Sequence, residues 1–245
     1  MMRFFAALIA GWMTSAAALA DGVLIFGATG QLGAPHVQML VTSGETVTAF
    51  VRPTSTRERL DGVDIQYAIG DLMDADSVRA AMELVKPRIV IDTSARREGS
   101  AGGKERFYAP AMQNIVDAAK VNGVEQIIIH SSVGVRGSAE ELLRETYGYD
   151  TRSPNMLDKG AAEVILEESG VPYTIIRNGV LDYEPAAPTG QAYLSDNMDA
   201  FGRITRTDLA ALAVGCIDNP ECINRIYHAQ DDSLSGPRPE RGESE

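Results

Sequence analysis

Cysteine is scarce: the 245 residues include only Cys216 and Cys222. Two cysteines are too few for a disulfide framework, and neither has a histidine at metal-binding spacing, so we expect neither zinc nor another metal. In an oxidising compartment the two could form one bridge across the end of a helix. Two separate, half-buried thiols are the alternative, and the sequence leaves both open.

Positive charge is also scarce, because 22 Lys and Arg face 34 Asp and Glu, which gives a net charge of −12 at pH 7. No run of basic residues offsets this excess locally. Such a surface repels nucleic acid and anionic membranes, so we expect neither as a partner. A nucleotide cofactor is not excluded, because a few backbone N–H groups can hold a diphosphate inside an acidic protein.

A long apolar run is missing as well. Residues 4–13 are apolar, but Thr14 and Ser15 follow, which leaves the run short for a membrane span. Arg3 before the run and small residues after it are typical of a signal peptide over residues 1–20. We therefore expect an exported protein, periplasmic or secreted, with a cytoplasmic or membrane-anchored protein as the alternative. No twin-arginine pair is present, which argues against export of a folded, cofactor-loaded protein.

From Val23 onward, short apolar runs alternate with helix-length segments, which is the pattern of βαβ units around a parallel sheet. The expected strands are residues 23–26, 46–51, 64–68, 88–92, 126–130 and 173–176. The sequence predicts one α/β domain over residues 21–230, a doubly wound Rossmann-type parallel sheet with helices on both faces. A polar, disordered tail is expected over residues 231–245.

Helix boundaries are indicated by capping residues. Asp74 can begin one helix, Gly123 ends another, and Ser153 with Pro154 begins a helix over residues 154–169. A further apolar helix is expected over residues 207–217. The stretch 178–203 is predicted to form a small irregular cap near the substrate cleft.

A glycine-rich turn follows the first expected strand and precedes an apolar helix: Gly27-Ala28-Thr29-Gly30-Gln31-Leu32-Gly33. In this context the first glycine permits a tight turn, the second lets the backbone approach a diphosphate, and the third lets the helix pack closely on the sheet. The helix N-terminus then directs N–H groups at the phosphates. The turn predicts a dinucleotide site, and glycines that serve packing alone are the alternative.

The end of the second strand indicates which dinucleotide binds. An Asp or Glu there would accept hydrogen bonds from the ribose of NAD, whereas this strand is followed by Arg52. Arg52, with Arg57 or Arg59 behind it, can pair with the 2′-phosphate of NADP. We predict NADP(H) as the cofactor; a solvated loop of arginines is the alternative.

These motifs resemble the atypical short-chain dehydrogenase/reductase superfamily, in particular its NmrA-like and isoflavone-reductase-like branches. The resemblance covers roughly residues 22–230. It rests on the glycine-rich turn, Arg52, Gly70-Asp71-Leu72, Ser131-Ser132, Lys159-Gly-Ala-Ala-Glu163, the segment SGVPYTIIR at 169–177 and TRTDLA at 205–210.

The resemblance implies a set of cofactor contacts along the ends of the strands. Asp71 and Leu72 would face the adenine, although Asp71 could be an ordinary turn residue. The remaining contacts would come from Thr93, Ser94, Ala95, Ser131 and Lys159. Asn178 and Gly179 stand where the family more often has Pro-Gly, beside the nicotinamide pocket.

Classical members of the superfamily carry a proton-donating Tyr four residues before the Lys, on the same helix face. Here the Lys is Lys159 and the residue four before it is Asn155, whose amide cannot supply a proton. In a reductase of a small carbonyl compound or activated alkene, Lys159 or Tyr149 would deliver the proton and Ser132 would bind the substrate oxygen. Burial beside a cationic nicotinamide would lower the pKa of Lys159.

Two alternatives remain open. Lys159 could instead form a surface ion pair with Glu163, one helical turn on. The chain could also bind NADP(H) without turnover, as a redox sensor or an assembly protein with a protein partner. His36, His130 and His228 fall in different elements with no visible shared partner, so we expect each to be structural.

Overall fold

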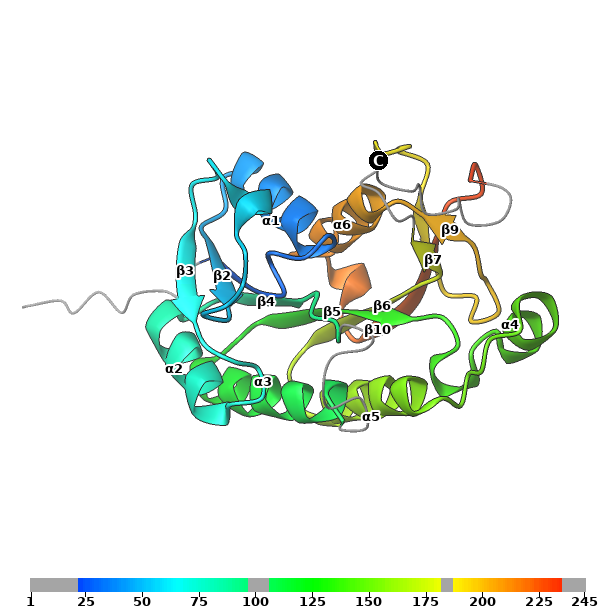
Figure 1. The fold of residues 1–245 in the computed structure, drawn as a ribbon, viewed down its shortest axis with the longest axis horizontal. Helices are drawn as coiled ribbons and strands as arrows, with labels where there is room; N and C mark the ends of the chain where they lie inside the picture. The colour runs from blue at the N-terminus through cyan, green and yellow to red at the C-terminus, as the bar shows by residue number, and fades with distance from the viewer. Residues whose placement is uncertain (1–21, 97–105, 182–186, 235–245) are drawn as a thin grey trace, which may run out of the picture.

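The first strand, β1 (Val23–Phe26), is buried along its whole length, because it lies inside a sheet that helices cover on both faces (Figure 1). The computed structural model describes residues 22–96, 106–181 and 187–234. Within these ranges the main sheet has eight strands in the order β3-β2-β1-β4-β5-β6-β10-β8. The chain order reverses between β1 and β4, which is where doubly wound folds bind ligands. The predicted fold class is confirmed.

The six predicted strands are all present, with their ends shifted by one or two residues where they differ. The other five are β2 (Val47–Val51), β3 (Gln66–Ile69), β4 (Ile89–Asp92), β5 (Gln126–Ser132) and β6 (Tyr173–Asn178). All six run parallel, and Val23 lies beside Val47 on one side and Ile89 on the other. Their carboxyl ends therefore meet at one edge of the sheet.

Four strands were not predicted. β10 (Arg225–Gln230) pairs parallel with β6, and β8 (Tyr193–Ser195) pairs antiparallel with β10. β7 (Val180–Leu181) and β9 (Arg203–Ile204) form a separate two-stranded ribbon. The prediction that residues 178–203 are irregular was therefore wrong in part. These strands escape sequence reasoning because β7, β8 and β9 are very short and β10 is polar and only partly buried.

The helices form a layer on each face of the sheet (Figure 1). α1 (Gly33–Thr42) and α6 (Arg206–Val214) cover one face, and α2 (Ala75–Val85), α3 (Tyr108–Asn122) and α5 (Pro154–Glu168) cover the other. Short 3-10 turns occur at Glu58–Leu60, Val135–Gly137 and Pro220–Cys222.

The predicted helix caps are confirmed. The Asp74 side chain accepts from the N–H of Asp76, and Gly123 ends α3 in the left-handed conformation. The Ser153 hydroxyl accepts from the N–H of Met156, which begins α5. One helix, α4 (Glu140–Tyr147), was not predicted, because it is short and mostly polar, with only Leu143 of its eight residues buried.

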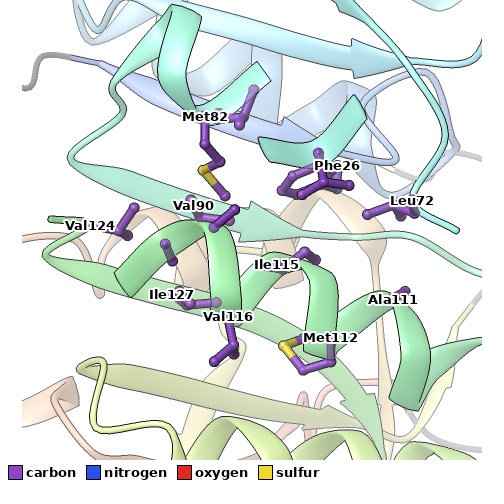
Figure 2. Packing of buried hydrophobic residues seen from close by; sticks show 14 of the residues in the cluster. Phe26, Leu72, Met82, Val90, Ala111, Met112, Ile115, Val116, Val124 and Ile127 are labelled. Atoms are coloured by element: carbon purple, nitrogen blue, oxygen red, sulfur yellow. The ribbon is translucent and has the colours of Figure 1, made fainter. Parts of the chain in front are cut away.

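Strand alternation divides the core between the two faces. Phe26 packs with Met82, Ile115 and Ile127 beneath α2 and α3 (Figure 2), whereas Ile25 faces α1 and α6. Each fully buried side chain of this size contributes about 1.5–3 kcal/mol relative to exposure. The result is a rigid sheet whose carboxyl edge holds the loops in place.

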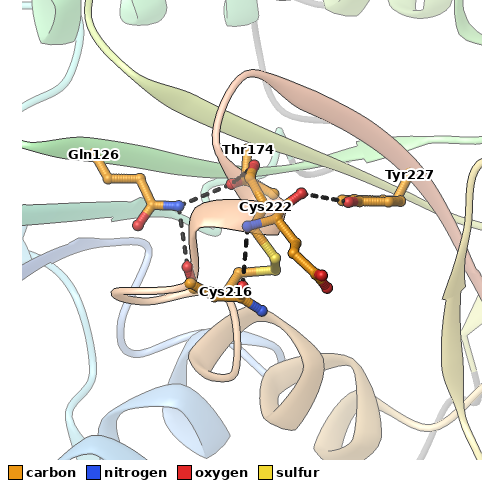
Figure 3. The surroundings of a disulfide bond; sticks show 7 residues. Gln126, Thr174, Cys216, Cys222 and Tyr227 are labelled. Carbon is orange, nitrogen blue, oxygen red and sulfur yellow. Dashed lines mark hydrogen bonds between the residues drawn. A yellow bond between two sulfur atoms is a disulfide. The ribbon is translucent and has the colours of Figure 1, made fainter.

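A disulfide joins Cys216 to Cys222 at the edge of the sheet where the parallel strands begin, with 5.4 Å between their Cα atoms (Figure 3). The Thr174 hydroxyl donates to the Cys222 carbonyl over 2.7 Å. The Gln126 amide donates to that hydroxyl over 2.9 Å and to the Cys216 carbonyl over 3.2 Å. Of the two cysteine alternatives the structure shows the bridge, tied to the amino ends of β5 and β6.

The chain termini fall largely outside the described residues. This holds for the predicted signal peptide, residues 1–20, so export stays a prediction. Of the predicted tail, residues 231–234 are described: Asp231 is buried, and the hydroxyl of Ser233 donates to it over 2.6 Å. In the part of the chain that is described, no helix is both long and apolar enough to cross a membrane.

Candidate functional site

The glycine-rich turn between β1 and α1 is packed tightly against itself. Gly27 has a φ of +76°, and a Cβ on Gly33 would lie 2.3 Å from the Gly27 carbonyl oxygen, so both positions require glycine. Gly30 is exposed, and a Cβ there would meet only that same oxygen, at 3.1 Å. No described side chain caps the N-terminus of α1. The turn presents open backbone at the positive end of a helix, which fits a diphosphate.

The predicted arginines lie around this turn. Arg52 directly follows β2 and is exposed. Arg59 donates to the carbonyl of Thr29 over 3.4 Å, which brings its loop to the glycine-rich turn. The guanidinium of Arg57 lies 4.3 Å from the centre of the Tyr67 ring. Arg52 and Arg59 are therefore placed beside the turn, whereas Arg57 is engaged on an aromatic face.

The residues assigned to the adenine follow β3. The carboxylate of Asp71 accepts from the N–H of Met73 over 2.9 Å, which is the ordinary turn role. Leu72 is buried in the core, and its carbonyl accepts from the Asn114 amide over 2.7 Å. Asp71 remains exposed at the carboxyl edge of the sheet. Adenine contacts by these residues stay predictions.

The end of β4 lies against the glycine-rich turn. The Thr93 hydroxyl donates to the carbonyl of Phe26 over 2.9 Å, and a Cβ on Gly27 would lie 2.7 Å from the Ser94 nitrogen. The Ser94 N–H donates to the Asp92 carboxylate over 2.8 Å, and Ala95 is exposed. Burial raises the pKa of Asp92 to about 6. Thr93 and Ser94, which directly follow β4, thus adjoin the turn.

Lys159, on α5, is directed at the end of β5. Its Nζ donates to the Ser132 Oγ over 2.6 Å and lies 5.1 Å from the centre of the Tyr108 ring. Burial lowers the pKa of Lys159 to about 8, although the charges of Glu163 and Asp92 oppose the shift. The ammonium is therefore a stronger acid than that of an ordinary lysine.

The alternative ion pair between Lys159 and Glu163 is wrong. Glu163 is fully buried and accepts from Arg177 on β6, over 3.0 Å from Nε and 2.6 Å from Nη2. Helical spacing suggested the pairing with Lys159, but the Glu163 side chain faces the sheet. There it meets Arg177, a partner on a strand that helical spacing cannot reveal.

Sequence reasoning missed two residues next to Lys159. The carboxylate of Asp158 accepts from the backbone N–H groups of Phe107 and Tyr108, over 2.7 and 2.8 Å, and so caps α3. This cap fixes the Tyr108 ring beside Lys159. No local pattern predicts it, because the two partners lie about fifty residues apart in the sequence.

A cavity of about 690 Å³ opens beside Ser132. Its wall includes Asn155 at the start of α5, Tyr149 after α4, Asn178 at the end of β6 and Gly179 directly after it. A Cβ on Gly179 would lie 2.1 Å from the carbonyl oxygen of Gly202, so glycine permits the close approach of this loop. Tyr149 thus lies in the cavity wall, while the ring next to Lys159 belongs to Tyr108.

The other predicted site residue of β5 is Ser131, which is buried and does not belong to the cavity wall. Over residues 22–96, 106–181 and 187–234, no group of three or more His, Cys, Asp or Glu is placed to hold a metal ion.

Two histidines share a hydrogen bond, contrary to the sequence-based expectation. The Nε2 atoms of His36 on α1 and His130 on β5 are 2.9 Å apart, and the Nδ1 of His36 lies 2.8 Å from the carbonyl of Leu32. A carbonyl only accepts, so His36 carries its proton on Nδ1 and accepts from His130 through Nε2. Because 94 residues separate the pair, only tertiary packing reveals it. The third, His228, contacts the carbonyl of Ala200 over 2.6 Å.

This histidine pair predicts a loss of stability in acid. Burial lowers the pKa of His36 to about 4 and the pKa of His130 well below its ordinary value. Below pH 6.5 the unfolded chain binds protons that the folded chain does not, so the free energy of unfolding falls as the pH decreases towards 4. Between pH 7 and pH 5, His36 alone accounts for about 2 kcal/mol.

Urea denaturation at the two pH values measures this loss. The matched control is the double variant His36→Leu/His130→Leu, which removes both titrating groups and should lose at least about 2 kcal/mol less between pH 7 and pH 5. Equal losses in the two proteins would show that the pair does not resist protonation.

Comparison with known proteins identifies the family to which the chain belongs. A family described as NAD(P)H-binding matches residues 27–220. An uncharacterised chloroplastic protein of Arabidopsis thaliana is 31% identical over 178 residues, which cover 65% of this chain and 53% of that protein. The chain thus spans about half the length of this relative. Sanguinarine reductase of Eschscholzia californica is 26% identical over 84% of this chain and 87% of its own length.

Among solved structures, ChuY, an anaerobilin reductase from Escherichia coli O157:H7, has a similar fold. It superposes with a TM-score of 0.71 and 25% sequence identity, over 88% of this chain and 99% of that chain.

Proposed function

The chain belongs to the NAD(P)H-binding family, and from this premise we propose that it is an NADP(H)-dependent reductase of a small carbonyl compound or activated alkene. The observation that carries the proposal is the 2.6 Å hydrogen bond between Lys159 and Ser132. It connects an ammonium of lowered pKa to a hydroxyl in the wall of a cavity. The names of sanguinarine reductase and of the anaerobilin reductase support a reductase class.

The bound cofactor would supply hydride to the acceptor. The backbone of the glycine-rich turn would hold the diphosphate and Arg52 the 2′-phosphate. The Ser132 hydroxyl donates a hydrogen bond to the acceptor oxygen and passes its proton on as negative charge develops there. Lys159 then donates a proton to Ser132, and a proton from the solvent restores the Lys159 ammonium.

Cofactor preference tests the role of Arg52. In Arg52→Gln we expect the Kd for NADPH to rise by about 10–100-fold and the Kd for NADH to stay unchanged, because hydrogen bonds to charged groups are worth about 1.5–3 kcal/mol and only NADPH carries the 2′-phosphate. Isothermal titration calorimetry gives both constants. The matched control is Arg79→Gln, which removes an exposed arginine of α2. A wild type that prefers NADH would overturn the assignment.

The alternative function is binding without turnover, as in a sensor or assembly protein, and Asn155 at the proton-donor position favours it. The two functions separate in one assay, the oxidation of NADPH in the presence of quinones, enals and ketones. A protein that binds NADPH and oxidises it with none of these acceptors is not a reductase of this class.

A further inference from the structure

The cavity wall carries an amide where a phenol would protonate a substrate. Asn155 lines the cavity four residues before Lys159. Tyr108 does not replace the phenol, because burial raises its pKa and its oxygen accepts from the N–H of Arg96 over 3.3 Å. It also presents its ring face to the ammonium of Lys159. The proton route that the geometry supports runs from Lys159 through Ser132.

This route suits some acceptors and not others. Hydride addition to an isolated ketone leaves an alkoxide, which is almost as basic as hydroxide and so requires a well-placed acid during the step. Addition to a conjugated carbonyl spreads the charge. A hydroquinone oxygen resembles a tyrosine phenolate, with a pKa of about 10. A serine hydroxyl backed by Lys159 is adequate for the second case.

We propose that the acceptor is a planar, conjugated carbonyl compound, a quinone or an enone, and not an isolated ketone or aldehyde. This inference rests on the proposed reductase function. In an enone, the hydride forms a C–H bond at the β-carbon, the C=C π electrons form a new π bond to the carbonyl carbon, and the electrons of the broken C=O π bond move onto the oxygen. Ser132 protonates that oxygen while Lys159 gives its proton to Ser132. The acceptor gains two electrons and NADPH loses two.

Aromatic side chains in the cavity wall support a flat acceptor. Tyr149 in its wall stacks on Tyr147, with ring centres 6.1 Å apart and planes 13° from parallel. Phe201, also in the wall, meets Tyr147 edge to face at 4.8 Å. Aromatic pairs of this kind hold one another in place and favour stacking of a further ring. A volume of about 690 Å³ also accommodates a fused-ring molecule.

A matched pair of acceptors tests the inference. 1,4-Naphthoquinone and 2-tetralone share a bicyclic frame, and the carbonyl of 2-tetralone is conjugated with neither the aromatic ring nor a C=C bond. With NADPH we expect kcat/KM to be at least about 100-fold higher for the quinone, which is the low end of what a general acid contributes. Lys159→Met measures the background reaction of the quinone with NADPH.

The variant Asn155→Tyr restores the missing phenol and should narrow the ratio of the two kcat/KM values by about 100-fold through faster ketone reduction. Asn155→Phe supplies the ring without the hydroxyl and should leave the ratio unchanged. If the wild type reduces 2-tetralone as fast as the quinone, the inference on acceptor class is wrong and the reductase function stands. If it binds NADPH and reduces neither, the reductase function itself fails, and the inference with it.

Discussion

Replacement of Lys159 by Met is expected to lower kcat for NADPH oxidation by about 10²–10⁴-fold, the contribution of a positioned general acid. Met keeps the length of the side chain and removes the ammonium that donates to Ser132 over 2.6 Å. Steady-state kinetics with a quinone acceptor measures the loss. The matched control is Lys120→Met, which removes an exposed lysine near the end of α3 and should retain wild-type kcat.

The role of Lys159 as an acid also predicts how kcat of the wild type depends on pH. Because the pKa of Lys159 is lowered to about 8, the ammonium loses its proton above that pH and kcat should decline about tenfold per pH unit. A profile that is flat to pH 10, or a Lys159→Met variant with near-normal kcat, would remove Lys159 from the mechanism.

Glu163→Gln is expected to destabilise the fold by about 3–5 kcal/mol, because it leaves a buried guanidinium without its counter-charge. The side chains of Glu163 and Arg177 are 0% and 5% exposed. For a domain of this size the loss corresponds to a decrease in Tm of about 10 °C. Urea denaturation gives the free energy of unfolding, with the slope as a check that both proteins unfold alike.

Glu167→Gln is the matched control for this prediction. Glu167 pairs with Arg136, whose side chain is 41% exposed, and its loss should cost less than about 1 kcal/mol. Similar losses in the two variants would show that burial of the Glu163 pair has no special role. A further variant, Glu163→Leu/Arg177→Met, should recover much of the stability, because it removes both charges together.

Much of the fold could be predicted from the sequence, because residues within or directly beside each interior strand and helix determine that element. β1 is a continuous apolar run between helical layers, and Asp74 and Ser153 cap helices through atoms two or three residues away. β10 could not be predicted in this way. Its sequence is polar and only partly buried, so no local pattern indicates a strand. β10 forms because it can hydrogen-bond to β6, and that partner is supplied by the sheet as a whole.

The residues of the candidate site divide in the same way, into those that local sequence patterns predict and those that only the fold brings together. The glycine-rich turn and Arg52 were predicted from spacing and residue type within one βα unit, and Lys159 was predicted from the resemblance to the family. The partners of Lys159 were only partly foreseen: the cap by Asp158 and the Tyr108 ring depend on contacts between distant segments. Local rules also offered an ion pair of Glu163 with Lys159 as an alternative, since helical spacing cannot show that a carboxylate faces a buried arginine on a strand.

Calorimetric titration with NADPH tests the central claim, that the open backbone between β1 and α1 holds the diphosphate of a dinucleotide. The account predicts that the wild type binds NADPH with micromolar affinity, and that Gly30→Val loses binding while it keeps the wild-type Tm, because Gly30 is exposed and a Cβ there meets only one atom of the turn. No heat of binding in the wild type, or undiminished affinity in Gly30→Val, would contradict it.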